Sequence, residues 1–187
     1  MRWREGVARL DPSLSVFVDE CGTHTSLTRL RARAPKGERA YGKVPRNRGR
    51  NTTLLASMTT EGMGPCMTVV GSTKKAVFEA YVEEVLAPSL RPGQVVVLDN
   101  LGAHRGERVR ELVEARGCSL LFLPPYSPDF SPIEEAFSKV KALLRKSKAR
   151  TRAVLVEAIG RALDAVSAQD ARGWFGHCGY RPVAQPS

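Results

Sequence analysis

The chain has 187 residues, 42% of them hydrophobic, which is enough for one domain with a sizeable core. It contains no run of about 20 apolar residues, so a membrane-spanning helix is excluded, and its polar start predicts no secretory signal. Lys and Arg outnumber Asp and Glu by 29 to 19, a net charge of +10 that indicates a polyanionic partner.

The first half of the chain predicts antiparallel strands. After an irregular lead over residues 1–13, the alternation of apolar and polar residues over 14–19 predicts a strand that ends in carboxylates. Residues 23–50, rich in Arg, Gly and Pro, predict an exposed basic loop. Residues 52–59 and 63–70 predict two strands that are joined as a hairpin.

The second half predicts helices that alternate with strands. Apolar residues recur at helical spacing over 77–86, and the uninterrupted apolar run at 95–99 predicts a strand buried on both faces. A short helix over 107–116 precedes an apolar strand over 119–123. Two more helices are expected, one from about Pro132 and one over 151–167. Together these elements predict a mixed α/β sheet of five strands flanked by helices, in one domain over 14–180 with a disordered tail over 181–187.

Three acidic residues lie where an α/β sheet usually binds its ligands. Asp19 and Asp99 end predicted strands, and Glu134 opens the helix that follows a proline-rich turn. If the two strands are parallel neighbours, Asp19 and Asp99 can share a cation at the carboxyl edge of the sheet. Three oxygen donors favour Mg²⁺ or Mn²⁺ over zinc. Each acid also has a plain structural explanation, as a turn residue or as a partner of the helix dipole.

The positive charge is concentrated in two blocks. Residues 29–50 hold nine basic side chains against one acid, and residues 139–152 hold seven against none, so the remainder of the chain is acidic overall. This clustering favours contacts with the phosphates of a nucleic acid. The alternative is that each block is a solvated surface that serves solubility.

Three stretches together resemble the catalytic domain of mariner-type DDE transposases, in the branch of the bacterial insertion sequences (the insertion sequence 630 group). The stretches are Val16–Glu20, Val97–Asn100 with His104 after it, and Leu123–Glu134 with its Pro-Tyr-Ser-Pro and Pro-Ile-Glu motifs. The resemblance covers about residues 14–180, and the 34 residues between Asp99 and Glu134 are the spacing of that family. Two departures are Ser131 in place of the commoner Asn and Phe137 in place of Trp.

The resemblance implies an RNase H-like fold in which Asp19, Asp99 and Glu134 are the catalytic and metal-binding residues, with two Mg²⁺ (or Mn²⁺) ions. It implies that water cuts a DNA strand at the transposon end and that the freed 3′-hydroxyl then attacks target DNA, at a TA dinucleotide. Auxiliary candidates are His104, Asn100 and Glu135. For His104 two interpretations stay open, because a histidine there can orient a carboxylate or substrate, or can hold a backbone carbonyl.

Seven basic side chains are predicted to contact the DNA backbone without reading its sequence. They are Arg46, Arg48, Arg50, Lys139, Lys141, Arg145 and Lys146. The expected partners are transposon ends and target DNA, with a homodimer as the active complex because two ends are joined in one event. The four cysteines form no Cys-x-x-Cys pair and predict free thiols, as expected for a cytoplasmic, nucleoid-associated bacterial protein without membrane contact.

The short lead over residues 1–13 cannot hold the helix-turn-helix modules that read transposon ends in complete transposases of this type. We therefore expect either a separate or frameshift-linked reading frame that supplies these modules, or a truncated copy. Two other functions remain open at this stage. One is another RNase H-like nuclease, such as an integrase or resolvase, and the other is a non-catalytic DNA-binding remnant.

Overall fold

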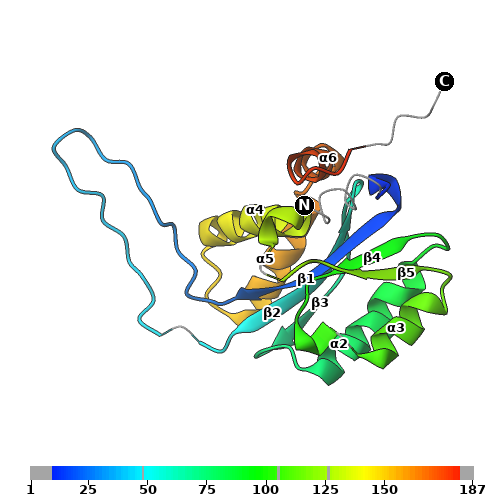
Figure 1. The fold of residues 1–187 in the computed structure, drawn as a ribbon. Helices are drawn as coiled ribbons and strands as arrows, with labels where there is room; N and C mark the ends of the chain where they lie inside the picture. Colours follow the sequence, from blue (N-terminus) through cyan, green and yellow to red (C-terminus); the bar gives the residue numbers. More distant parts are fainter. Residues whose placement is uncertain (1–9, 48, 105, 126, 182–187) are drawn as a thin grey trace.

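The computed structural model describes residues 10–181 except Arg48, Arg105 and Tyr126, so the expectations for residues 1–9, 48 and 182–187 lie outside it. It contains one five-stranded sheet in the order β3-β2-β1-β4-β5 (Figure 1). β2 pairs antiparallel with β1 and β3, whereas β4 pairs parallel with β1 and β5, so the predicted mixed sheet is confirmed. The strands are β1 (Ser15–Thr23), β2 (Thr52–Thr59), β3 (Gly62–Val70), β4 (Val95–Leu98) and β5 (Ser119–Phe122).

Helices cover both faces of the sheet (Figure 1). The helices α2 and α3 pack on one face, and α4, α5 and α6 pack on the other. The helix predicted over 77–86 is observed in two parts, because α2 continues into a π-helical turn, η2 (Val82–Leu86). The α-helices are α2 (Lys75–Tyr81), α3 (Glu107–Glu114), α4 (Pro132–Ser147), α5 (Arg152–Asp164) and α6 (Ala168–His177). Short turns are η1 (Pro12–Leu14), η3 (Ala87–Ser89), η4 (Gly102–His104) and η5 (Pro128–Phe130).

The central strand β1 divides the core into two halves. Because successive side chains of a strand point to opposite faces, Val16 and Val18 join the core under α2 and α3, while Phe17 and Cys21 join the core under α4 to α6. Asp19 shares the face of Phe17 and Cys21. The alternation within β1 therefore places this carboxylate on the side of the sheet that α4 covers.

The prediction of one last helix over 151–167 is wrong in its extent. The helix α5 ends at Asp164, and Ser167 caps a further helix, α6, that was not predicted. Ser167 and Asp170 form a capping box, in which each side chain accepts a hydrogen bond from the backbone N–H of the other residue. The Ser-x-x-Asp spacing was the available signal, but the apolar periodicity of the preceding helix ran on past it.

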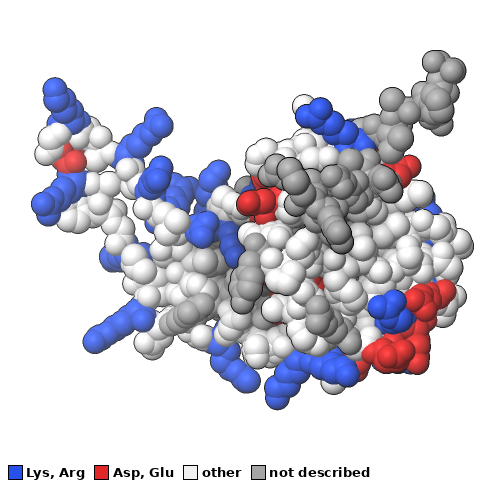
Figure 2. Space-filling view, viewed as in Figure 1, with Lys and Arg blue, Asp and Glu red and all other residues white. Residues whose placement is uncertain are grey.

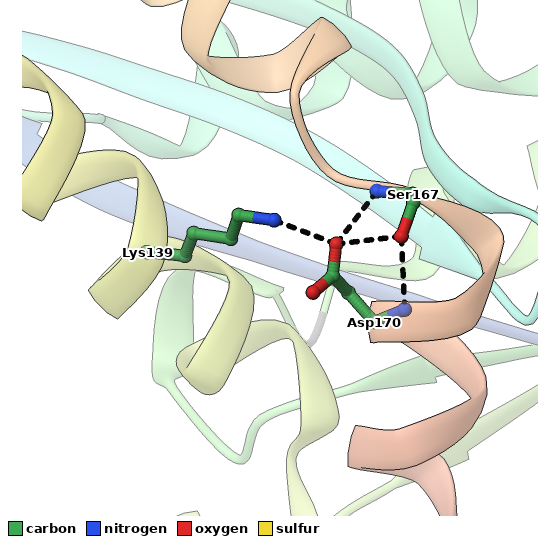
Figure 3. Close-up of polar contacts among 3 residues, drawn as sticks. All are labelled: Lys139, Ser167 and Asp170. Atoms are coloured by element: carbon green, nitrogen blue, oxygen red, sulfur yellow. Dashed lines mark hydrogen bonds and ion pairs between the residues drawn. The ribbon is translucent and has the colours of Figure 1, made fainter.

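An ion pair joins the start of α6 to the middle of α4 (Figure 3). The Nζ atom of Lys139 lies 2.6 Å from Oδ2 of Asp170. The same oxygen accepts hydrogen bonds from Ser167, from its N–H at 2.9 Å and from its hydroxyl at 2.7 Å. These contacts, with Lys139 the largest cause, lower the pKa of Asp170 to about 2.

Two expectations from composition can be compared with the structure. The free thiols are confirmed, since Cys21, Cys66, Cys118 and Cys178 are all unpaired. In the part of the chain that the structure describes, no helix has the length and apolar character needed to cross a bilayer.

Replacing Asp170 by Asn removes the ion pair to Lys139 and leaves a neutral amide oxygen as the acceptor in the capping box. The folded-state pKa of Asp170 lies below its unfolded value, so its stabilising contribution is present above about pH 4 and is lost as the pH falls toward about 2. We expect D170N to be less stable at neutral pH and to lack this part of the acid dependence. Urea unfolding at a series of pH values measures both effects.

The matched control is D164N, which neutralises an exposed acid at the end of α5. Equal acid dependence of unfolding in D170N and D164N would contradict the structural role given to Asp170.

Candidate active site

A cavity of about 370 Å³ opens at the carboxyl end of β4, next to Asp19 in the middle of β1. The prediction that the first strand ends at Asp19 is wrong, because β1 continues to Thr23 through its antiparallel pairing with β2. Asp19, Asp99 and Glu134 all line it, so the structure brings the three predicted acids to one place. The segment that leads from β5 to α4 forms the opposite wall. The other lining residues are Asn100, Leu101, Leu123, Pro124, Pro125, Ser127, Pro128 and Ser131.

The parallel pairing of β1 with β4 positions the two aspartates. Val18 lies directly opposite Leu98 in the register; Asp19 is the next residue of β1, and Asp99 comes directly after the last residue of β4. Parallel neighbours run about 4.8 Å apart, so Asp19 and Asp99 lie side by side. The condition that the sequence left open, that these strands are parallel neighbours, is met.

Glu134 reaches the cavity from the first turn of α4. Pro132 occupies the first helical position, where a missing N–H costs nothing, and the buried Ser131 precedes it. The N–H of Glu134 donates to the carbonyl oxygen of Ser131 at 3.1 Å. The start of this helix, and with it the place of Glu134, therefore depends on the proline-rich segment before it.

The three carboxylates differ in their exposure to solvent. Asp19 is buried, Asp99 is half-buried and Glu134 is exposed. The pKa of Asp19 is raised to about 7, mainly by burial and in part by the nearby charges of Glu134 and Asp99, while a hydrogen bond of 2.7 Å from the N–H of Glu20 acts in the opposite direction. The cavity thus has a deep end at Asp19 and a mouth at Glu134.

His104 holds the carboxylate of Asp99. Its ring is buried in η4 and stacks on Phe78 of α2, with ring centroids 4.1 Å apart. The Nδ1 atom contacts Oδ1 of Asp99, and the N–H of Leu101 donates to the same oxygen at 3.2 Å. With Asp99 as a carboxylate, the shared hydrogen belongs to Nδ1. Of the two interpretations of His104, the contact with a carboxylate is the one observed.

The two other auxiliary candidates lie in different surroundings. Asn100 lines the cavity, and its Oδ1 atom is buried without a hydrogen-bond partner in the described part of the chain. Glu135 instead contacts Nδ1 of His177 and lines a neighbouring cavity of about 490 Å³, which shares Glu134 with the first. His177 was not singled out from the sequence, which carries no local signal for a contact across 42 residues.

The donors around the cavity fit a hard divalent cation. Three carboxylates and the unpartnered amide oxygen of Asn100 make an all-oxygen set, which Mg²⁺ and Mn²⁺ prefer. A cation among them would also offset the repulsion that raises the pKa of Asp19. Over residues 10–181, no three His, Cys, Asp or Glu side chains are already grouped closely enough to hold a metal ion. The assignment as metal ligands therefore stays a prediction.

The basic loop between β1 and β2 projects from the body as a long arm, residues 24–51 (Figure 1). Arg46 and Arg50 are exposed on it. Arg150 fixes its base, donating to the carbonyl oxygens of Thr25 at 2.9 Å and Leu27 at 3.2 Å. Figure 2 shows Lys and Arg along the arm at the left, whereas Asp and Glu gather at the lower right, over α3.

The predicted DNA-contacting residues of α4 do not all present a free charge. The ammonium group of Lys139 pairs with Asp170, and the Lys139 side chain is about a third exposed. Lys141 is half-buried beside the thiol of Cys21 on β1, two residues after Asp19. Arg145 and Lys146 lie in the last turn of α4, with Lys146 exposed.

Comparison with known protein families assigns most of the chain to one family. Residues 15–155 match the family described as "DDE superfamily endonuclease". No curated protein matches the chain in sequence.

Solved structures share its fold. The Mos1 transposase paired-end complex with left transposon end superposes with a TM-score of 0.76 at 16% identity, covering 94% of this chain and 57% of that one. The Mos1 mariner paired end complex with Mn gives 0.68 at 16%, covering 95% and 55%. The catalytic domain of Mos1 mariner transposase gives 0.59 at 14%, covering 94% and 86%. The chain therefore has the RNase H-like fold of that domain, and it spans 57% of the length of the first transposase chain.

Replacing Asp19 by Asn removes a buried carboxylate that repels its neighbours. Because the folded-state pKa of Asp19 lies near 7, above its unfolded value, the metal-free chain loses stability as the pH rises from about 4 to about 7, by at most about 4 kcal/mol. We expect D19N to lack this loss and to be more stable than the unaltered chain at pH 8 without divalent ions. Thermal and urea unfolding measure the difference.

Added Mn²⁺ should stabilise the unaltered chain more than D19N, because only the former offers all three carboxylates. A D19N variant that is less stable at pH 8 in the absence of metal would show that Asp19 has favourable partners other than a cation.

Proposed function

The chain belongs to the DDE superfamily endonuclease family, and from this membership we propose that it is the catalytic part of a DNA transposase of the bacterial insertion-sequence 630 group. The observation that carries the proposal is the cavity that Asp19, Asp99 and Glu134 share at the carboxyl end of β4, beside the middle of β1. A purely structural explanation of each acid does not account for their convergence, since like charges placed together oppose folding.

The proposed reaction has two displacements at phosphorus. In the first, a water oxygen bonds to phosphorus as the bond to the 3′-oxygen breaks, which leaves a 3′-hydroxyl on the transposon end and a 5′-phosphate on the flanking strand. In the second, that 3′-hydroxyl attacks a target phosphodiester and releases a target 3′-hydroxyl. Two Mg²⁺ or Mn²⁺ ions, when bound by the three carboxylates, would stabilise the charge on the attacking and leaving oxygens.

The protein groups have separate tasks in this proposal. Asp19, at the deep end, and Asp99, whose Oδ1 is held by His104, provide fixed donors. Glu134 stands at the mouth, where the DNA strand enters. Asn100 adds an amide oxygen to the same donor set.

Basic side chains on the arm and along α4 support a DNA partner. The proposed phosphate contacts are Arg46, Arg48 and Arg50 on the arm, and Lys139, Lys141, Arg145 and Lys146 on α4. Because Lys139 is already paired with Asp170, it contributes less to DNA binding in this proposal than Arg145 and Lys146 do.

We further propose that the substrates are transposon ends and target DNA and that the active complex is a homodimer. We also propose that the end-reading modules are encoded in another frame and that the protein acts at the nucleoid in the bacterial cytoplasm.

Incubating the purified chain with supercoiled plasmid and Mn²⁺ tests the proposed cleavage. We expect conversion of the plasmid to the open circle, and we expect D99N and E134Q each to lower the rate by roughly 100-fold or more. Gel electrophoresis of plasmid forms measures the rate. An oligonucleotide with a recessed 3′-hydroxyl, added to the same reaction, reports joining to the plasmid.

The matched control is E107Q, because Glu107 is an acid in the first turn of α3 as Glu134 is in the first turn of α4. Equal losses in E107Q and E134Q would support a helix-dipole role for Glu134 and contradict catalysis. Cleavage without joining would indicate a hydrolytic RNase H-like nuclease. DNA binding without any cleavage would indicate a non-catalytic remnant.

The salt dependence of DNA binding tests the two basic blocks. Each phosphate contact contributes about 0.9 to the slope of log affinity against log salt. We expect R46Q/R50Q and R145Q/K146Q each to flatten that slope by roughly 2, as measured by fluorescence anisotropy on a labelled duplex over a range of NaCl concentrations.

The control R108Q/R110Q removes the same charge from α3, where Arg108 pairs with Glu83 and Arg110 pairs with Glu114. If this pair flattens the slope as much as the others, net charge alone governs binding and the two blocks are not specific contact surfaces.

A further inference from the structure

The chain end beyond the family match packs against the candidate active site. The matched segment ends at residue 155, whereas α6 and the buried Tyr180 come after it. They nevertheless contact β1 just before Asp19 and the segment just before Glu134.

The first contact is an aromatic cluster beneath Asp19. Phe17, two residues before Asp19 on the same face of β1, meets Phe175 of α6 edge-on at 5.2 Å between ring centroids. Tyr180 meets Phe17 in the same manner at 5.0 Å. All three rings are almost fully buried. Close packing of this kind holds its members in single rotamers, so β1 is fixed against α6 at the point where Asp19 emerges.

The second contact reaches the turn that starts α4. The hydroxyl of Tyr180 donates to the carbonyl oxygen of Phe130 at 2.7 Å, four residues before Glu134. At the end of α6, three residues before Tyr180, Nδ1 of His177 contacts Oε1 of Glu135, the neighbour of Glu134. Together with the ion pair between Lys139 and Asp170, α6 and the residues after it contact α4 at two places in its first half and η5, the turn before α4, at one.

The local sequence explains how Tyr180 is brought into place. α6 ends in a Schellman motif, in which Tyr180 N–H donates to Phe175 O at 2.9 Å and Gly179 N–H donates to Gly176 O at 3.1 Å. Gly179 has φ +93°, in the left-handed region that glycine adopts without strain. The chain therefore turns back on itself, and the Tyr180 ring packs against Phe175 at 5.8 Å.

We propose that α6 and Tyr180 form a positioning brace that sets the placement of Glu134 relative to Asp19. This inference rests on the proposed function, and it adds to it that residues outside the matched family segment act on the site through others. Tyr180 is a positioning residue, since its hydroxyl contacts Phe130 in the segment that leads into α4 and lies apart from the reacting atoms. A misplacement of about 1 Å at a reacting centre is enough to lower a rate by about 100-fold.

The test compares two buried tyrosines whose hydroxyls each donate to a backbone carbonyl. Y180F removes the bond to Phe130, and Y81F removes a bond of 2.9 Å to Pro65 on the other side of the sheet. Each variant should lower the melting temperature by about 2–4 °C, as the loss of one such bond predicts. Only Y180F should weaken Mn²⁺ binding, by about tenfold, and slow plasmid nicking by a similar factor. Electron paramagnetic resonance of free Mn²⁺, well below both melting temperatures, measures the affinity.

A second pair tests the backbone turn. G179A and G71A each place a methyl group at a left-handed glycine, with φ +93° and +94°, where no neighbouring atom lies within 4 Å of the added carbon. The backbone strain is therefore matched, but only G179A should reduce Mn²⁺ affinity. Hydrogen exchange by mass spectrometry should increase over residues 127–137 in Y180F and G179A, and not in Y81F and G71A.

The outcomes separate the two proposals. If the members of each pair match in Mn²⁺ affinity, nicking and local exchange, the brace is overturned while the proposed function stands. If the unaltered chain neither binds Mn²⁺ nor nicks DNA, the proposed function fails and the positioning role fails with it. This holds even if hydrogen exchange still shows that Tyr180 stabilises residues 127–137.

Discussion

The parallel pairing of β1 with β4 is the contact on which the candidate site depends. It joins the antiparallel half of the sheet to the parallel half, and its register places Asp19 beside Asp99. A shift of one residue would turn the side chains of one strand to the opposite face and would separate the two carboxylates. The buried apolar residues on both sides of β1 hold this register, so core packing and site geometry have the same origin.

This arrangement places repulsive charge where the protein is least able to solvate it. Asp19 is buried and its pKa is raised to about 7, while Glu134 and Asp99 lie close enough to add to the shift. The fold compensates at Asp99, whose Oδ1 is held by His104 and by the N–H of Leu101. A site that opposes folding and is retained in a well-packed core is more easily understood through function than through stability.

Charge is divided across the molecule in a way that suits a ligand with one charged face. The arm and the last turn of α4 carry basic side chains, and α3 carries acids on the opposite side (Figure 2). Within the basic set, the structure distinguishes cations with intramolecular partners from exposed ones. Lys139 stabilises the contact between α4 and α6, and Arg150 anchors the base of the arm, which leaves Arg46, Arg50 and Lys146 as exposed charges.

The sequence by itself determined the elements and the three acids. Apolar periodicity is local, so it located the five strands and the helices through α5, and it singled out Asp19, Asp99 and Glu134 beside them. Three errors came from the same local reasoning: the early end of the first strand at Asp19, the overrun of α5 and the missed start of α6 at Ser167. Only the tertiary structure decided that His104 holds Asp99, that Asp170 engages Lys139, and that Tyr180 reaches Phe130. The last two contacts join residues 31 and 50 apart in the chain, and which helices become neighbours is decided by packing on the sheet, which no local pattern encodes.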